Sequence, residues 1–159
     1  MSQAVASLWF PEVQAPAETP LAILRAQAEE LSKLTGGMLV GVVDHWPDEG
    51  DKLKITLEIM APELGRSRFR ILLVQHDFIM PYPAVFDAEM FRPRGLASLA
   101  AATAIITGEK KPDNRADDDP EFRELLKRVL HSAPVKALVS SLSARVTELR
   151  NARPADATV

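Results

Sequence analysis

The stretch from Lys52 to Met60 reads Lys-Leu-Lys-Ile-Thr-Leu-Glu-Ile-Met, and it decides the fold class of this chain. Apolar and polar side chains alternate with a period of two, which is typical of a β-strand with one buried and one solvated face. The residues expected on the buried face are Leu53, Ile55, Leu57 and Ile59. Such a strand predicts an antiparallel sheet that is covered on one side only.

Three further segments have strand character and are joined to this one by short turns. They are residues 38–43, 68–74 and 84–86. The alternation over 68–74 predicts that Phe69, Ile71 and Leu73 face the core together with the apolar residues of 52–60. Consecutive strands joined by short turns predict a four-stranded antiparallel meander.

Helical patterns lie on both sides of the strands. A helix over 20–35 is predicted because Thr19 can cap it and Gly36-Gly37 can end it. Two more helices are predicted, one from Asp119-Pro120 and one capped by Ser132. The expected fold is therefore α+β: an N-terminal helix, the meander, and two C-terminal helices packed on one face of the sheet.

The expected domains are an extended N-terminal arm over residues 1–18, a single α+β domain over 19–150 and a flexible tail over 151–159. Leu8-Trp9-Phe10 is interpreted as a staple that packs on the domain, with an interface hot spot as the alternative. Residues 87–107 show no clear pattern, except that the alanine-rich segment 96–106 fits a helix or a buried strand, and residues 109–119 are predicted to be a loop.

The composition excludes several classes of site. The chain has 159 residues, a net charge of −3 and no cysteine, so it can hold neither a disulfide nor a thiolate nucleophile or zinc–thiolate site. A cysteine-free chain fits a reducing compartment, and we find neither a membrane-spanning run nor a signal peptide in the first ten residues. We expect a cytoplasmic protein that does not bind nucleic acid, since its net charge gives no attraction to phosphate.

Two resemblances rest on short motifs. The motifs are Thr19-Pro20, Ile23-Leu24, Gln27-Ala28, Ala61-Pro62, Leu64, Arg68, Leu73, His76, Tyr82-Pro83 and Val85. On these residues the chain resembles a family of small bacterial proteins of unassigned function, which implies a fold and a bacterial origin but no activity. The order of helix, meander and Tyr-Pro loop also resembles the ubiquitin-conjugating-enzyme fold. The catalytic cysteine of that fold has no counterpart here, so the resemblance implies a non-catalytic, partner-binding variant.

Candidate catalytic residues are His76, Asp77 and Tyr82, because a histidine–carboxylate pair can orient a general base. The structural alternative is a partly buried His76 that is hydrogen-bonded to the loop of Tyr82. The histidines show no metal-ligand spacing, and the sequence contains neither a nucleophile elbow nor a phosphate-binding motif. We therefore predict no metal and no cofactor.

Candidate binding residues lie on the outward side of the predicted strands. They are Lys52, Lys54, Arg68 and Arg70, with Arg66 at the neighbouring turn and Glu58 opposing them. A basic sheet face would suit an acidic partner, whereas charged residues on a solvated face are also what solubility requires. No aromatic residue interleaves with these cations, which argues against single-stranded nucleic acid.

Together these observations favour a non-enzymatic protein-interaction module of adaptor, immunity or chaperone type, whose partner is another protein, an acidic one if the basic face is used. The alternatives are a small enzyme that uses His76 with Asp77 or Tyr82, and a sensor that binds a small ligand between sheet and helices. The pattern predicts no oligomeric state.

Overall fold

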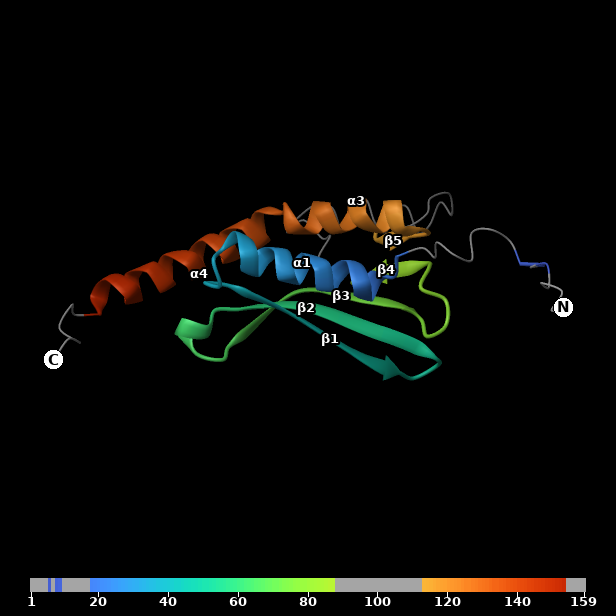
Figure 1. Cartoon of the computed structure of the whole chain (residues 1–159), viewed down its shortest axis with the longest axis horizontal. Helices are drawn as coiled ribbons and strands as arrows, with labels where there is room; N and C mark the ends of the chain where they lie inside the picture. Colours follow the sequence, from blue (N-terminus) through green and yellow to red (C-terminus); the bar gives the residue numbers. More distant parts are fainter. Residues whose placement is uncertain (1–5, 7, 10–17, 88–112, 154–159) are drawn as a thin grey trace, which may run out of the picture.

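The computed structural model describes residues 6, 8, 9, 18–87 and 113–153. Its elements are α1 (Pro20–Leu34), β1 (Val40–Asp48), β2 (Lys52–Met60), the short helix η2 (Pro62–Leu64), β3 (Arg68–Asp77), β4 (Ala84–Phe86), β5 (Arg115–Ala116), α3 (Asp119–Leu130) and α4 (Ala133–Ala152) (Figure 1). The strands form one antiparallel sheet in the order β1-β2-β3-β4-β5. The predicted α+β fold is confirmed.

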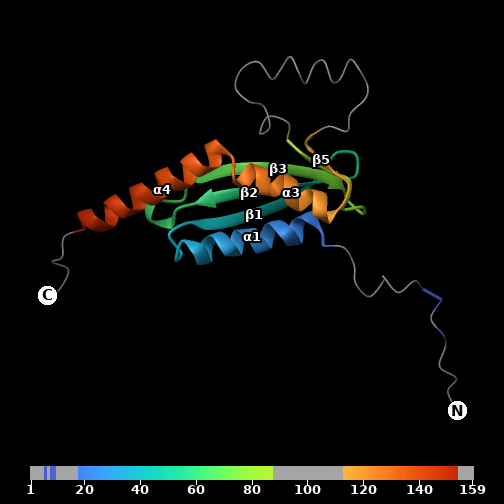
Figure 2. The ribbon, with the colours of Figure 1, turned by 90° about the horizontal axis from the view of Figure 1, so that it is seen from above.

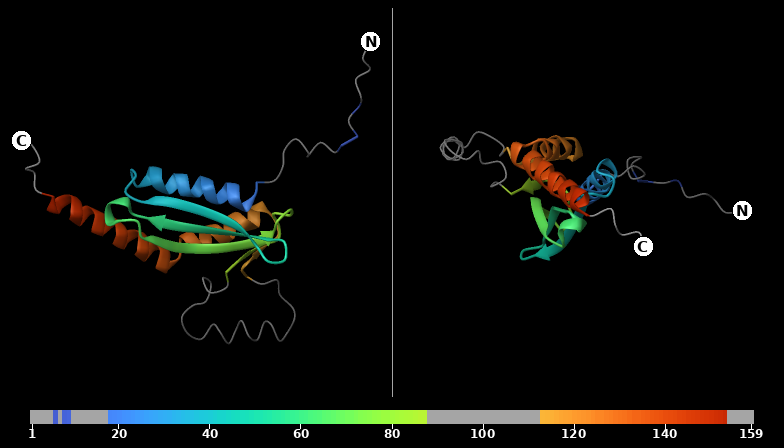
Figure 3. Two further views of the ribbon diagram at one scale, coloured as in Figure 1. Left: turned by 90° about the horizontal axis from the view of Figure 1, so that it is seen from below. Right: turned by 90° about the vertical axis from the view of Figure 1, so that its left-hand side faces the viewer.

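The helices form a single layer on one face of this sheet (Figure 2). α1 packs mainly on β1, α3 contacts β3 and β5, and α4 contacts η2. The second half of α4 extends past the end of the sheet (Figure 3). Within the described residues, no helix has the length and hydropathy that crossing a membrane requires.

The sheet has five strands rather than the four expected. The additional strand, β5, lies within residues 109–119, which were predicted to be a loop. It pairs with β4, and Ala116 is fully buried. A strand of two residues is too short to show a period, so the sequence carries no signal for it. Residues 88–107 of the ambiguous segment lie outside the described residues.

A β-bulge between β2 and β3 changes which residues of β3 face the core. Leu57 pairs with Leu72 whereas Glu58 pairs with Arg70, so Ile71 has no paired residue on β2. The extra residue reverses the alternation beyond it. Leu72 and Val74 are therefore buried against the helices, and Leu73 faces the other way.

The predicted core is confirmed in part. Ile55, Leu57, Ile59 and Ile71 are buried, and Leu53 is half-buried. Leu73 is wrong as a core residue because of the bulge. Phe69 is also wrong, since its side chain is 38% exposed near the end of the sheet. The largest fully buried side chains include Phe86 and Phe122, whose ring centroids lie 5.0 Å apart.

Local signals place α1 as predicted. The Thr19 side chain accepts a hydrogen bond from the Ala22 amide at 3.2 Å, and Gly36 and Gly37 have positive φ angles just beyond the last turn. Gly41 of β1 then lets the helix approach closely. A Cβ atom at position 41 would lie 2.5 Å from the Ala28 Cα, so only glycine fits without a backbone shift.

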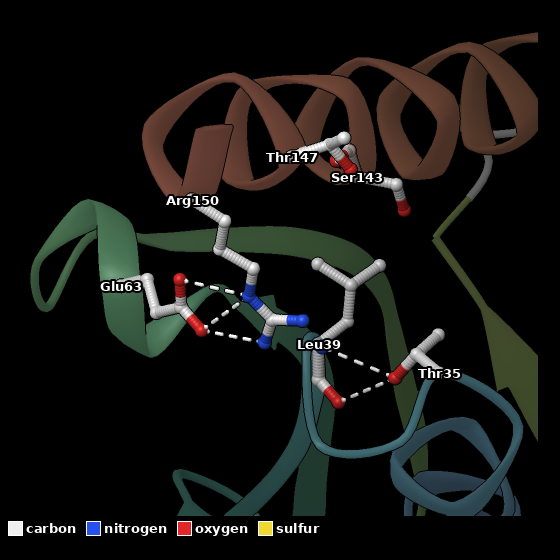
Figure 4. A network of polar contacts seen from close by, with 6 residues as sticks. All are labelled: Thr35, Leu39, Glu63, Ser143, Thr147 and Arg150. Atoms are coloured by element: carbon white, nitrogen blue, oxygen red, sulfur yellow. Dashed lines mark hydrogen bonds and ion pairs between the residues drawn. The ribbon is translucent and has the colours of Figure 1, made fainter. Parts of the chain in front are cut away.

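The far end of α4 is fastened to η2 by a bidentate ion pair (Figure 4). Arg150 Nε lies 2.9 Å from Glu63 Oε1, and a second guanidinium nitrogen lies 2.6 Å from the same oxygen. The hydrogen bonds from Arg150 hold the pKa of Glu63 below its ordinary value. This ion pair joins the second half of α4 to η2.

Candidate functional site

The structure separates the three candidate catalytic residues. His76 points toward the helix layer and is only 6% exposed. Its Nδ1 donates to the Asp77 carbonyl oxygen at 2.6 Å, which leaves Nε2 buried and without a hydrogen-bond partner among the described residues. The hydrogen-bonding capacity of Nε2 is therefore unused on the core side of the ring.

Asp77 and Tyr82 are engaged elsewhere. Asp77 follows His76 in the same strand, so its side chain lies on the opposite face, where it pairs with Lys52. The Tyr82 hydroxyl donates to the Glu18 carbonyl at 2.7 Å. Burial, reinforced by the charge of Asp119, raises the pKa of Tyr82 to about 12. The alternative in which His76 is hydrogen-bonded to the loop of Tyr82 is thus wrong, and the three side chains do not converge on one reaction centre.

The candidate binding residues lie where the alternation predicts. β2 and β3 place Lys52, Lys54, Arg68 and Arg70 on the outer face, which we define as the face of β1, β2 and β3 turned away from the helices. Arg68 lies 3.7 Å from Glu58, as expected from the opposing positions of these residues. Arg66 precedes β3 and is exposed.

Acidic residues that were not predicted to lie on this face neutralise much of its positive charge. Lys54 lies 2.9 Å from Asp48, and Arg68 lies 2.9 Å from Asp44. Both carboxylates come from β1, which was expected to end at residue 43. Because β1 continues to Asp48, it lays acidic side chains beside the cations of β2 and β3. The outer face therefore carries positive and negative side chains in ion pairs rather than a basic patch.

An apolar cluster that the sequence analysis missed lies in the loop after β3. Phe78, Ile79 and Met80 are 61%, 86% and 59% exposed, and we call them the apolar loop. The signal was present as three consecutive apolar residues between Asp77 and Pro81 that fit neither strand alternation nor a turn. Soluble proteins seldom expose adjacent large apolar side chains without a binding role.

Both ends of the apolar loop are attached to ordered parts of the fold. At its start, the Phe78 amide donates to the Asp51 carbonyl in the β1–β2 turn at 2.8 Å. At its end, the Tyr82 ring makes an edge contact with Phe122 of α3, with centroids 6.3 Å apart. These anchors hold the loop in position, which lowers the entropic cost of binding a partner.

Two open grooves lie at the margins of the sheet. The first, of about 510 Å³, is lined by Arg25, Ala28, Glu29, Ser32, Lys33, Gly41 and Val43. The second runs between β5 and α3, and its lining includes Arg115 and Arg128. In the part of the chain that is described, no three histidine, aspartate or glutamate side chains are arranged to hold a metal ion.

The N-terminal staple is not formed at the two positions that can be seen. Leu8 is 99% exposed and Trp9 is 74% exposed, while Phe10 lies outside the described residues. The interpretation of Leu8 and Trp9 as core anchors is therefore wrong.

A scan against protein-family models and searches of curated proteins and of solved structures found no match to this chain.

Proposed function

We propose that this chain is a non-enzymatic protein-interaction module of adaptor, immunity or chaperone type that works in a bacterial cytoplasm. The observation that carries the proposal is the apolar loop. Complete burial of a large apolar side chain contributes about 1.5–3 kcal/mol, so burial of the exposed parts of Phe78, Ile79 and Met80 would supply a substantial share of the binding free energy of a complex.

The charges around the apolar loop indicate which kind of pocket on a partner would bind it. Asp51 and Glu49 are exposed in the neighbouring turn, and Asp77 directly precedes the loop. Lys52 is already paired with Asp77, so the surroundings of the loop carry a negative excess. This arrangement supports a protein partner with an apolar pocket and a basic rim, because complementary charge directs encounter and orientation.

Co-purification from the native host tests the proposal. Tagged wild-type chain is compared with a variant that carries Phe78→Ser, Ile79→Ser and Met80→Ser, and with the control Leu34→Ser. Leu34 is also an exposed apolar residue, but it lies at the end of α1. We expect a stoichiometric partner with the wild type and the control, and its loss with the loop variant.

Thermal melts show whether the loop variant keeps its fold. Since the three side chains are exposed, its melting temperature should stay within a few degrees of the wild type. A partner that the folded loop variant retains, or the absence of any stoichiometric partner, would contradict the proposal.

A further inference from the structure

β1 is an edge strand that lacks several of the usual protections. It pairs with β2 through nine consecutive residue pairs without a bulge, and no other described strand pairs with it. Natural edge strands are commonly protected by charged side chains, above all lysine, or by proline, bulges, short length or a covering helix. α1 packs on the helix face of β1. β1 contains no lysine or arginine, and its one proline, Pro47, stands next to the last residue. Its outer edge therefore offers backbone groups along most of its length.

The first groove lies directly beside this edge. Its lining comes from α1 and β1 alone, and α1 runs along the β1 side of the sheet (Figure 2). The base of the groove is small and apolar, since Gly41 and Ala28 are in backbone contact and Val43 is half-buried. A strand added to β1 would place alternate side chains in this groove, beneath the outward side of α1.

Two cations mark the ends of the groove. Arg25 and Lys33 are exposed and form no ion pair with a described residue, while Glu29 lies between them. Eight residues of helix separate the two cations by about 12 Å, at 1.5 Å per residue. In an extended chain, about 13 Å separates residues i and i+4, which lie on the same face. The spacing of the cations thus matches two acidic side chains at i and i+4.

We propose that β1 and this groove bind an extended peptide segment of another protein as a sixth strand. The segment carries acidic residues at i and i+4 and a small apolar residue at i+2, which rests against Gly41 and Ala28. Backbone hydrogen bonds to β1 provide affinity, and Arg25 and Lys33 select the sequence. This surface is separate from the apolar loop and does not depend on the function proposed above.

A second copy of this chain fits the site less well. Antiparallel pairing of two β1 strands would put the helix layers of both copies on the same side of the joined sheet. The β1 residues on that side are Gly41, Val43, His45 and Pro47, none of which is acidic. Asp44 and Asp48 lie on the outer face, where they pair with Arg68 and Lys54.

The probe is the capped peptide Thr-Glu-Thr-Val-Thr-Glu-Thr, added to the isotopically labelled full-length chain. We expect amide chemical-shift changes concentrated in α1 and β1, with saturable binding. The same peptide with lysine in place of both glutamates should bind at least tenfold more weakly. Methylation of the backbone nitrogens that face β1 should abolish binding, whereas methylation of the alternate nitrogens should not.

A charge exchange makes the test specific. The variant Arg25→Glu with Lys33→Glu should reverse the preference and bind the lysine peptide more tightly than the glutamate peptide. The matched control Lys136→Glu with Arg145→Glu makes the same charge change on exposed positions of α4 and should behave as the wild type.

Three results would overturn the proposal. They are the absence of shift changes in α1 and β1 at millimolar peptide, equal binding of the peptide whose β1-facing nitrogens are methylated, and equal affinity for the glutamate and lysine peptides. Sedimentation of the chain without peptide tests whether a second copy of the chain occupies the β1 edge instead. We expect a monomer, and a dimer that is broken by Val43→Pro would assign the edge to a second copy.

Discussion

The two faces of the sheet are built by the same strands, yet one face buries apolar side chains and the other carries exposed ion pairs. On the helix face, Ile55, Leu72 and Val74 are fully buried. On the outer face, Lys54 and Arg68 are partly exposed and paired with carboxylates of β1. Because burial removes apolar surface from water and exposed ion pairs gain little, stability is concentrated on the helix face. Substitutions on the outer face, in the apolar loop or at the β1 edge should therefore cost little stability.

The largest expected effect compares two neighbouring leucines. Leu72→Ala should lower the free energy of unfolding by about 2–5 kcal/mol, because its side chain is fully buried against the helices. Leu73→Ala should cost less than half of that, since Leu73 lies on the outer face and is half-buried. Urea denaturation of both variants measures the difference. Equal losses would mean that the bulge at Ile71 does not exist.

The next effect concerns the contact between α1 and β1. Gly41→Ala places a Cβ atom 2.5 Å from the Ala28 Cα, so the helix must move away from the strand. We expect a loss of about 1–3 kcal/mol, measured by denaturation. Val42→Ala, a change on the outer face of the same strand, serves as the control and should cost less. A Gly41→Ala variant as stable as the wild type would show that α1 sits farther from β1.

A smaller effect is expected on the outer face. Arg68→Gln removes the ion pairs with Asp44 and Glu58, but Arg68 is half-exposed, so the loss should be below about 1 kcal/mol. Most of that loss should disappear in 1 M salt, which screens exposed charges. Arg66→Gln is the control, because Arg66 forms no ion pair with a described residue. A loss above 2 kcal/mol would place Arg68 in a structural role.

The smallest effect is a pH dependence at the end of α4. Arg150 lowers the pKa of Glu63 in the folded chain, so the carboxylate stabilises the fold fully above its ordinary pKa of 4.5. That contribution is lost as pH falls through the lowered pKa. The stability difference between wild type and Glu63→Gln should therefore shrink below about pH 4.5. Denaturation curves at several pH values test this, and a constant difference would contradict it.

Much of the fold could be predicted because its signals are local. Thr19 and Gly36-Gly37 bracket α1, and the alternation of Lys52 to Met60 predicts a one-sided sheet. The helix that begins at Asp119 was also expected, and the structure adds that Asp118 caps it by accepting from the Glu121 amide at 2.9 Å. Ser132 occupies the cap position of α4, but its side chain makes no capping hydrogen bond.

The candidate site was predicted less well, because its residues depend on partners far away in the sequence. His76 and Asp77 are neighbours in the chain but point to opposite faces of β3. The cations of the outer face were visible, whereas their pairing with Asp44 and Asp48 depends on how far β1 extends. The sequence contains the apolar loop as a run of three apolar residues, but only the exposure of these residues in the structure makes the loop a candidate for binding.

The sequence by itself determined the α+β class, the order of the elements and the residues of β2 that face the core, since periodicity and capping act over a few residues. Only the tertiary structure decided the register of β3, the pairing of β5 with β4 and the contact of Gly41 with Ala28. A bulge adds one residue without changing the apolar composition of the strand, and it reverses every side chain that follows. Likewise, a strand is an edge strand only because no other strand pairs with its outer side. No local sequence pattern can encode that absence.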